Sequence, residues 1–297
     1  DSFTYVVADT YGGFATGKVT VAITGLNNPP VASNDSLTVS EHVGLTPISA
    51  QLLLNDSDPD AGETTTLAIT AVNTTGTHGA VVLSAGAISY NPNNGFGNLP
   101  LGSNVIDHFT YTIQDVHGQS STASVNVTIV GQNDTPVAQD DSLSMPANNP
   151  ATNLTAWMLG NDSDSDPGET ATLSILSIDA STTRGSLSLT NGAVFYQPGP
   201  QFQSLPAGSN QVDTYSYIIQ DIHGATAQAY VTVTYLGCND PPIAGPDSIS
   251  VLAGQTTNLT SLMLSNDFDP DTGETASLVI SQAFTNGTSG TLALNNG

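Results

Sequence analysis

Three short loops of the sequence concentrate carboxylates at a fixed spacing. Each loop carries aspartates at positions i, i+2 and i+4 and closes with a glutamate. The carboxylates are Asp56, Asp58, Asp60 and Glu63 in the first loop, Asp162, Asp164, Asp166 and Glu169 in the second, and Asp267, Asp269, Asp271 and Glu274 in the third. Carboxylates packed this closely repel one another unless a cation lies among them. Since Ca²⁺ takes six to eight hard oxygen ligands in tolerant geometry, the loops predict calcium sites.

The composition of the loops argues against other metal sites. Zinc favours His or Cys ligands, which the loops lack. Mg²⁺ usually keeps several waters and needs fewer protein oxygens. The spacing also differs from that of an EF-hand, because Gly62 is seventh after Asp56 is counted first, and Leu67 stands at position twelve.

The acidic loops are one landmark of an internal repeat. The segment DSFTYVVAD at 1–9 returns as DHFTYTIQD at 107–115 and as DTYSYIIQD at 213–221, each 106 residues further on. The stretch NNPPVA at 27–32 returns as NDTPVA at 133–138 and NDPPIA at 239–244. Three landmarks in one register predict tandem structural units.

The proline-containing stretches are the natural boundaries of these units, because proline cannot donate to a sheet ladder and favours an extended connection. We therefore expect residues 1–28 to be the last two strands of one repeat. Residues 29–134 and 135–240 are expected to be complete repeats, and 241–297 the first strands of another. An isolated pair of strands is marginal in water, so we expect the chain to be a piece of a longer array.

Within a repeat the apolar residues alternate with period two, and no segment predicts a helix. In the first complete repeat the expected strands span 35–40, 48–54, 66–72, 80–83, 87–90, 108–114 and 123–130. Seven short strands separated by Gly, Asn, Pro and Ser predict an all-β protein. The expected architecture is a linear array of tandem Ig-like, seven-strand Greek-key β-sandwiches.

The topology of such a sandwich predicts which other polar residues join each loop. The loop between the second and third strands, the loop between the sixth and seventh, and the incoming linker share one pole. The end of the preceding repeat faces the same junction, where a divalent ion would cancel repulsion and fix the interdomain angle. The additional candidate ligands are Asn28, Asp107, Asp115, Asp134, Asp213, Asp221 and Asp240.

Charge and hydropathy exclude several classes of partner. The chain has 2 Lys and Arg against 26 Asp and Glu, a formal net charge of −24. Nucleic acids and anionic lipid surfaces require cationic side chains, so neither is an expected partner. No stretch has enough consecutive apolar residues for membrane insertion by this segment, and Cys238 has no second cysteine for an intrachain disulfide.

The three landmarks together resemble the bacterial cadherin-like repeats, which include the VCBS-type repeats of giant secreted adhesins. The resemblance covers essentially the whole chain and implies tandem Ig-like domains that bind Ca²⁺ at or near their junctions. It implies an extracellular extender whose partners are neighbouring repeats of the same chain. It also adds Glu41 as a candidate ligand, matching a Glu that follows the first strand in the family. Ala147 and Ala253 replace it in later repeats, so later junctions would hold fewer ions.

Two alternatives remain open at this point. The first is a Ca²⁺-dependent glycan-binding module, for which Trp157 is the single tryptophan, although we expect it to fill the core. The second is a subunit of a self-assembling extracellular filament or sheath, with other copies of the chain as partners. An enzyme is not expected: His117 and His223 follow Asp115 and Asp221 by two residues and are interpreted as turn residues, and no nucleophile motif occurs.

Overall fold

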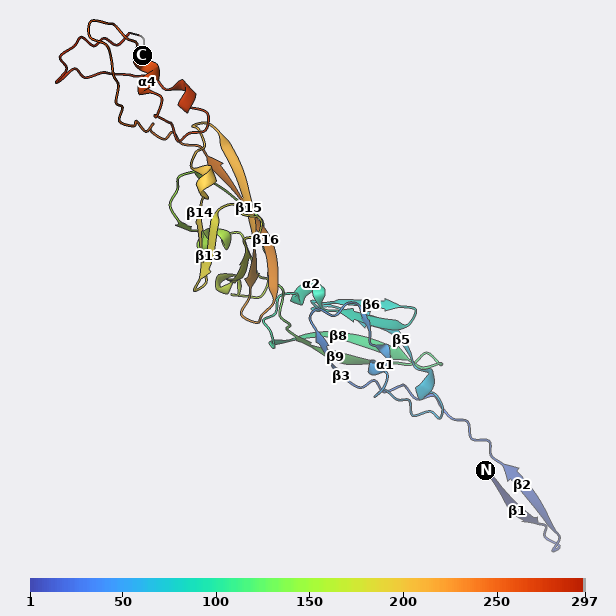
Figure 1. Cartoon of the computed structure of the whole chain (residues 1–297). Coiled ribbons are helices and arrows are strands. Elements are labelled where there is room, and N and C mark those ends of the chain that lie inside the picture. Colours follow the sequence, from blue (N-terminus) through green and yellow to red (C-terminus); the bar gives the residue numbers. More distant parts are fainter. Residues whose placement is uncertain (296–297) are drawn as a thin grey trace. The chain divides into compact units, whose positions relative to one another are not determined.

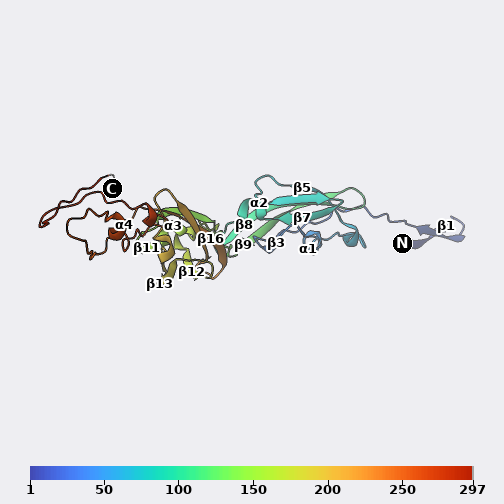
Figure 2. The ribbon, with the colours of Figure 1, turned by 45° about the horizontal axis from the view of Figure 1, so that its top comes forward.

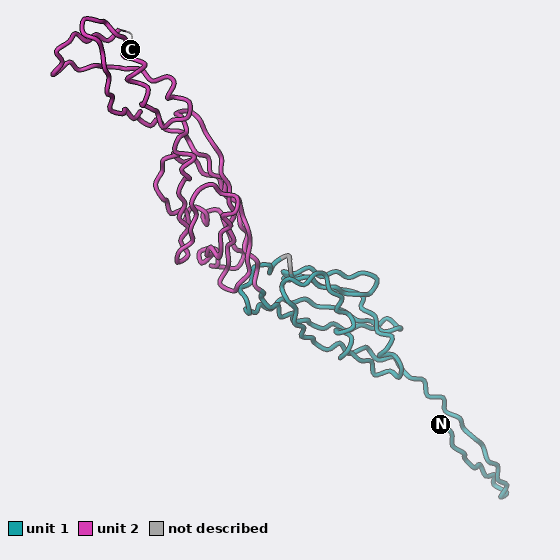
Figure 3. The backbone as a smooth tube through the Cα atoms, viewed as in Figure 1, with its two compact units in different colours: residues 1–132 teal, residues 133–297 magenta. Residues whose placement is uncertain are grey.

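The computed structural model describes residues 1–295, except the side chains of residues 93 and 94. It divides into two compact units, residues 1–132 and 133–297 (Figure 3). Each unit contains one complete β-sandwich, and the two sandwiches repeat the same order of elements.

The first sandwich contains seven strands in two sheets (Figure 1). A four-stranded sheet has the order β3-β9-β8-β5 and a three-stranded sheet the order β4-β7-β6. Strand β3 runs parallel to β9, and the other neighbours are antiparallel. The elements are β3 (Asp35–Ser40), β4 (Thr46–Pro47), α1 (Ser49–Leu52), η1 (Thr64–Thr66), β5 (Ala68–Asn73), β6 (Ala80–Ser84), β7 (Ala87–Asn91), α2 (Asn93–Phe96), β8 (Asn104–Gln114) and β9 (Ser120–Val130).

The second sandwich has the same topology, with sheets β10-β16-β15-β12 and β11-β14-β13. Figure 2 shows both sandwiches from a second direction. The elements of the second sandwich are β10 (Asp141–Pro146), β11 (Thr152–Asn153), α3 (Thr155–Met158), η2 (Thr170–Thr172), β12 (Ser174–Asp179), β13 (Ser186–Thr190), β14 (Ala193–Gln197), η3 (Pro200–Phe202), β15 (Asn210–Gln220) and β16 (Thr226–Leu236). The all-β fold of tandem seven-strand sandwiches is therefore confirmed.

The core of each sandwich comes from alternate residues of the long central hairpin. On β8, Phe109, Tyr111 and Ile113 are buried while the residues between them are not. On β15 the equivalent residues Tyr215, Tyr217 and Ile219 are also buried. Period-two alternation thus sets the face that packs against the second sheet.

The strand expected at 48–54 is wrong. The chain makes the two-residue strand β4 and then the helical turn α1, in which Ile48 and Leu52 are both buried. Their spacing of four residues matches one helical turn, so both side chains reach the core from one face. The second repeat has the equivalent helical turn α3, so Trp157 lies on a helix and not on a strand. Its side chain is partly buried and packs against the core.

The flanking segments carry less regular structure. Strands β1 (Ser2–Ala8) and β2 (Phe14–Thr20) form a hairpin on which Phe3, Tyr5 and Val7 are about half exposed. The described part of 241–297 contains the short helices α4 (Thr260–Met263) and η4 (Thr275–Ser277), and no strand is assigned there. Among the described residues, no helix has the length and apolar character needed to cross a bilayer.

Candidate metal centre

Each acidic loop lies between the four-residue α-helix and the 3-10 helix of its repeat. In the first repeat the loop follows α1 and leads through η1 into β5. Gly62 has a φ of +89°, in the left-handed region that favours glycine, and Gly168 and Gly273 repeat this conformation at +91° and +89°. An isolated bridge between Val31 and Ser57 ties the incoming linker to the loop. The backbone therefore presents the same loop shape in all three copies.

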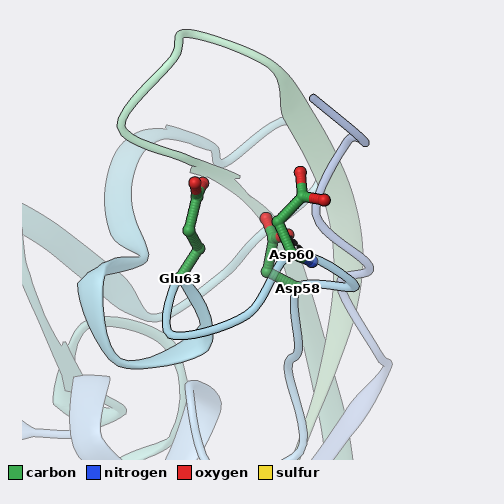
Figure 4. Close-up of side chains that lie close together, drawn as sticks. All are labelled: Asp58, Asp60 and Glu63. Atoms are coloured by element: carbon green, nitrogen blue, oxygen red, sulfur yellow. Dashed lines mark hydrogen bonds between the residues drawn. The ribbon is translucent and has the colours of Figure 1, made fainter. Parts of the chain in front are cut away.

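The loop brings three of its four carboxylates together. Asp58, Asp60 and Glu63 each offer an oxygen within 4.8 Å of the others, and they project from one short segment (Figure 4). The same grouping occurs for Asp164, Asp166 and Glu169, and for Asp269, Asp271 and Glu274. We call these three groups the acid clusters.

The linker before each repeat is bonded to the second aspartate of its cluster. The backbone N–H of Asn28 donates to Asp60 Oδ2 at 2.7 Å. Asp134 N donates to Asp166 Oδ2, and Asp240 N donates to Asp271 Oδ2, both at 2.9 Å. The structure thus places the three candidate linker residues beside the clusters.

The turn between the sixth and seventh strands also reaches this pole. Asn27 Nδ2 donates to Asp115 Oδ2 at 2.9 Å, and Asn133 Nδ2 donates to Asp221 Oδ2 at 2.8 Å. Burial alone would raise the pKa of Asp115, but bonds from Asn27 and from backbone N–H groups lower it below its ordinary value. The pKa of Asp221 is lowered in the same way. Linker, acidic loop and turn therefore meet within both complete repeats, as the strand topology predicts.

Several buried oxygens at this pole accept no hydrogen bond. They are Asn27 Oδ1, Asp58 Oδ2 and Glu63 Oε2 in the first repeat, Asn133 Oδ1, Asp164 Oδ2, Asp166 Oδ1 and Glu169 Oε2 in the second, and Asp271 Oδ1 in the third. All are acceptors, and a buried acceptor without a donor costs free energy. Carboxylate and amide oxygens are the ligands that Ca²⁺ prefers, so the residues present fit that ion.

The electrostatics of the second cluster point the same way. Burial raises the pKa of Glu169 above its ordinary value. The nearby imidazole of His223 opposes this rise, and the charges of Asp166, Asp164 and Asp221 add to it. A cation bound in the cluster would remove the repulsion between these carboxylates.

The first aspartate of each loop lies outside its cluster. Asp56 Oδ1 accepts a bond from Ser33 N at 2.8 Å, and its Oδ2 accepts one from the Tyr111 hydroxyl at 2.9 Å. The Tyr111 hydroxyl also lies 3.0 Å from the buried Asp35. Asp162 repeats this contact with Tyr217, and Asp267 Oδ1 accepts from Gly245 N at 2.8 Å. Of the four carboxylates expected from the spacing, the structure therefore groups three in each loop, and the first accepts hydrogen bonds from elsewhere in its repeat.

Two further candidate ligands are held inside their own repeats. Asp107 is fully buried and accepts bonds from His78 N, Gly79 N and the Tyr90 hydroxyl. Burial alone would raise the pKa of Asp107, but these bonds lower it. Asp213 accepts bonds from the Thr183 and Tyr196 hydroxyls and from backbone N–H groups. Neither carboxylate belongs to an acid cluster.

Glu41 is also fully buried, and its carboxylate accepts backbone bonds from Leu99 N and Gln132 N. Its oxygens therefore already have donors within the first unit. At the corresponding position of the second repeat, Ala147 is buried in the core. The replacement of Glu41 by Ala147 therefore exchanges a carboxylate that accepts backbone hydrogen bonds for a small apolar side chain in the core.

The buried pair formed by Asp141 and Asp162 predicts a pH effect. Burial raises the pKa of Asp141 from 3.8 to about 6, the Tyr217 bond opposes the rise, and the charge of Asp162 adds to it. Because the folded pKa lies above the unfolded one, the contribution of this group to stability is complete below pH 3.8 and is lost as the pH rises through about 6.

We therefore expect Asp141→Asn to gain stability over the wild type between pH 4 and 7, by up to about 3 kcal/mol. Denaturant unfolding followed by Trp157 fluorescence reports on this repeat, since Trp157 is the single tryptophan. If the wild-type and variant free energies ran parallel across this pH range, the assignment of the proton to Asp141 would be incorrect.

Some residues at the site escaped sequence reasoning. Asn27 bonds Asp115 and leaves its own Oδ1 unpaired, and the recurrence of Asn at 133 and 239 could have identified it. The imidazoles of His117 and His223 contact Glu63 and Glu169, each at 3.1 Å. The sequence placed His117 and His223 in turns, but it did not indicate that their side chains contact the acidic loops.

Comparison with known proteins gives the family. The bacterial cadherin-like domain family matches at residues 27–131 and again at 133–237. No match was found among curated proteins. The two matched stretches each contain one of the sandwiches described above.

Similar solved structures are cadherin fragments with low identity. The crystal structure of mouse protocadherin-24 EC1–3 is 18% identical, covers 80% of this chain and 79% of that chain, and has a TM-score of 0.41. Protocadherin gamma C5 EC1–3 is 17% identical, with 78% and 76% covered and a TM-score of 0.39. The two tandem matches to one family, on sandwiches with one topology, show that the chain belongs to the bacterial cadherin-like domain family.

Proposed function

We propose that these repeats bind Ca²⁺ at their acid clusters and serve as a non-enzymatic extender in an extracellular bacterial protein, such as an adhesin or a surface filament. One observation carries the proposal. The same group of two aspartates and one glutamate recurs in three loops, with buried oxygens that accept no hydrogen bond. Turn formation alone does not explain it, because a turn needs no oxygen held away from every donor.

The residues that would hold the ion come from two or three segments of each repeat. In the first repeat they are Asp58, Asp60 and Glu63 of the cluster, with Asn27 and Asp115 beside them. In the second they are Asp164, Asp166 and Glu169, with Asn133, Asp134 and Asp221. In the third they are Asp269, Asp271 and Glu274, with Asp240. A bound Ca²⁺ would supply charge neutralisation and a fixed link between the linker and the loop.

An extender needs connections that resist bending, and the bonds of the linker residues support this role. Asn28, Asp134 and Asp240 each donate a backbone bond to the cluster of the repeat that they enter. An ion in the cluster would hold the linker against the sandwich, whereas small polar interdomain contacts by themselves permit motion. The net charge of −24 would keep neighbouring chains from associating.

The proposal predicts calcium binding that can be counted. Isothermal titration of the calcium-free protein should show at least one ion for each of the three acid clusters. Small-angle scattering should show a longer and narrower distribution of dimensions after calcium is added. Mg²⁺ at the same concentration is the control, because it dehydrates reluctantly and demands stricter geometry. No heat of binding and an unchanged scattering profile at millimolar calcium would refute the proposal.

A further inference from the structure

Two of the three acid clusters are contacted by an imidazole. His117 Nε2 lies 3.1 Å from Glu63 Oε1, and His223 Nε2 lies 3.1 Å from Glu169 Oε1. The His117 side chain is 57% exposed and that of His223 is 33% exposed, so an ion in solvent can reach both. The turn that carries this histidine has no counterpart within residues 241–297, where the third cluster is formed by carboxylates alone.

The backbone fixes the position of each histidine. Asp115 Oδ1 accepts bonds from His117 N at 2.9 Å and from Gln119 N at 2.8 Å, and Gly118 adopts a φ of +92°. Asp221 Oδ1 makes the same bonds to His223 N and Ala225 N, and Gly224 has a φ of +98°. The turn therefore carries its imidazole toward the cluster in both repeats, which explains the identical distance.

Both clusters that an imidazole contacts contain buried oxygens without donors. Glu169 is 6% exposed and Asp166 is 1% exposed, and each has one buried oxygen that accepts no bond. In the first repeat Asp58 is 8% exposed and its Oδ2 is likewise unpaired. Each histidine therefore contacts a cluster in which some carboxylate oxygens accept no hydrogen bond.

The chemistry of this ligand set differs from that of carboxylates alone. Imidazole nitrogen suits zinc and other first-row transition metals, whereas Ca²⁺ takes oxygen. Two ligand atoms bound to one zinc ion at about 2.0–2.1 Å lie about 3.3 Å apart at the tetrahedral angle. The observed separation of 3.1 Å between nitrogen and oxygen is that of a hydrogen bond, and it is close enough to the zinc value for both atoms to bind one ion after a small movement.

We propose that the first and second acid clusters also bind a divalent transition metal, with Zn²⁺ as the ion to test. His117 with Glu63 and His223 with Glu169 would supply the nitrogen and one oxygen, and the cluster aspartates, whose oxygens lie within 4.8 Å of a glutamate oxygen, would supply further oxygens. Residues 241–297 contain no histidine, so within this stretch the third cluster is a carboxylate-only comparison. The inference uses carboxylates that the proposed function assigns to calcium, so zinc and calcium compete at these two repeats.

The test is a zinc titration of the calcium-free full chain, followed by calorimetry and by NMR of the imidazole nitrogens. We expect two zinc ions of similar affinity and a shift of the Nε2 resonances of His117 and His223. Replacing either residue with Gln should weaken one of the two sites by on the order of tenfold or more, since losing even an outer partner of a metal ligand has an effect of that size. His78→Gln is the matched control, because His78 is exposed and lies outside the clusters.

Each outcome decides the inference. Zinc affinity that is unchanged in the double variant His117→Gln and His223→Gln would overturn it, as would a third zinc site of equal affinity or no zinc binding at all. Calcium titration of the same double variant is read separately. If the double variant binds calcium but not zinc, both proposals are supported. If the wild type binds zinc but not calcium, only the proposed function is refuted.

Discussion

A chain carrying Asp164→Asn and Asp166→Asn should unfold in its second repeat at the same temperature with and without calcium. The wild type should gain about 2.7 kcal/mol for a site at a calcium concentration one hundred times its dissociation constant. The variant loses this gain because two of the three carboxylates of its cluster are gone. Without calcium it should be at least as stable as the wild type, since removing the charges also removes their repulsion.

Trp157 makes this prediction specific to one repeat. It is the single tryptophan and packs against the core of the second sandwich, so its fluorescence follows that sandwich. The matched control is Asp58→Asn with Asp60→Asn in the first repeat, which should leave the calcium response of Trp157 intact. Because tandem repeats couple to their neighbours, the control variant is expected to change the calcium response of Trp157 only slightly. If the second-repeat variant kept the full wild-type response to calcium, the cluster would not be the site.

Asp213→Ala should destabilise the second repeat strongly, and by the same amount with and without calcium. The carboxylate is 3% exposed and accepts bonds from the Thr183 hydroxyl at 2.6 Å, the Tyr196 hydroxyl at 2.8 Å and the backbone N–H of Gly185 at 3.1 Å. Alanine leaves these donors buried without an acceptor, at a cost of about 1 to 3 kcal/mol each. The expected loss is therefore several kcal/mol in denaturant unfolding.

The control for this variant is Asp179→Ala, at an exposed position whose carboxylate caps a local turn through Ser181 N. It should change stability much less than Asp213→Ala. If Asp213→Ala folded normally without calcium and lost only the calcium response, Asp213 would be a metal ligand, as its sequence position first indicated. Because Asp213→Ala could prevent folding altogether, Tyr196→Phe tests the same network more mildly.

These two variants separate two kinds of acidic residue that look alike in the sequence. Asp164 and Asp166 lie in a cluster with unpaired oxygens, so their contribution depends on an added cation. Asp213 is bonded by donors of its own repeat, so its contribution is present without an ion. Both kinds recur in every complete repeat, and recurrence by itself therefore does not identify a ligand.

The sequence predicted the larger features of this protein correctly. Landmarks recurring after 106 residues indicated tandem units, and alternation on the strands indicated which face enters the core. These features are readable because a strand places successive side chains on opposite faces wherever it occurs. The expected strand 35–40 has the bounds of β3, and the strand topology gathered linker, loop and turn at one pole.

The helix α1 shows where local pattern was insufficient. Ile48 and Leu52 are compatible with a strand on composition, but β4 is only two residues long and a helical turn buries both side chains. A tertiary requirement thus overrode a local preference.

The choice of ligands was likewise decided by tertiary structure. Spacing placed Asp56 and Asp58 in one series, but Asp56 accepts a bond from the hydroxyl of Tyr111, distant in sequence, and lies outside the cluster. His117 enters the site from a turn 54 residues beyond Glu63. A sequence records which oxygens and nitrogens are available at each position. Whether a carboxylate is free to bind an ion depends on the donors that folding brings within about 3 Å of it, and those donors come from strands, linkers and turns distant in sequence.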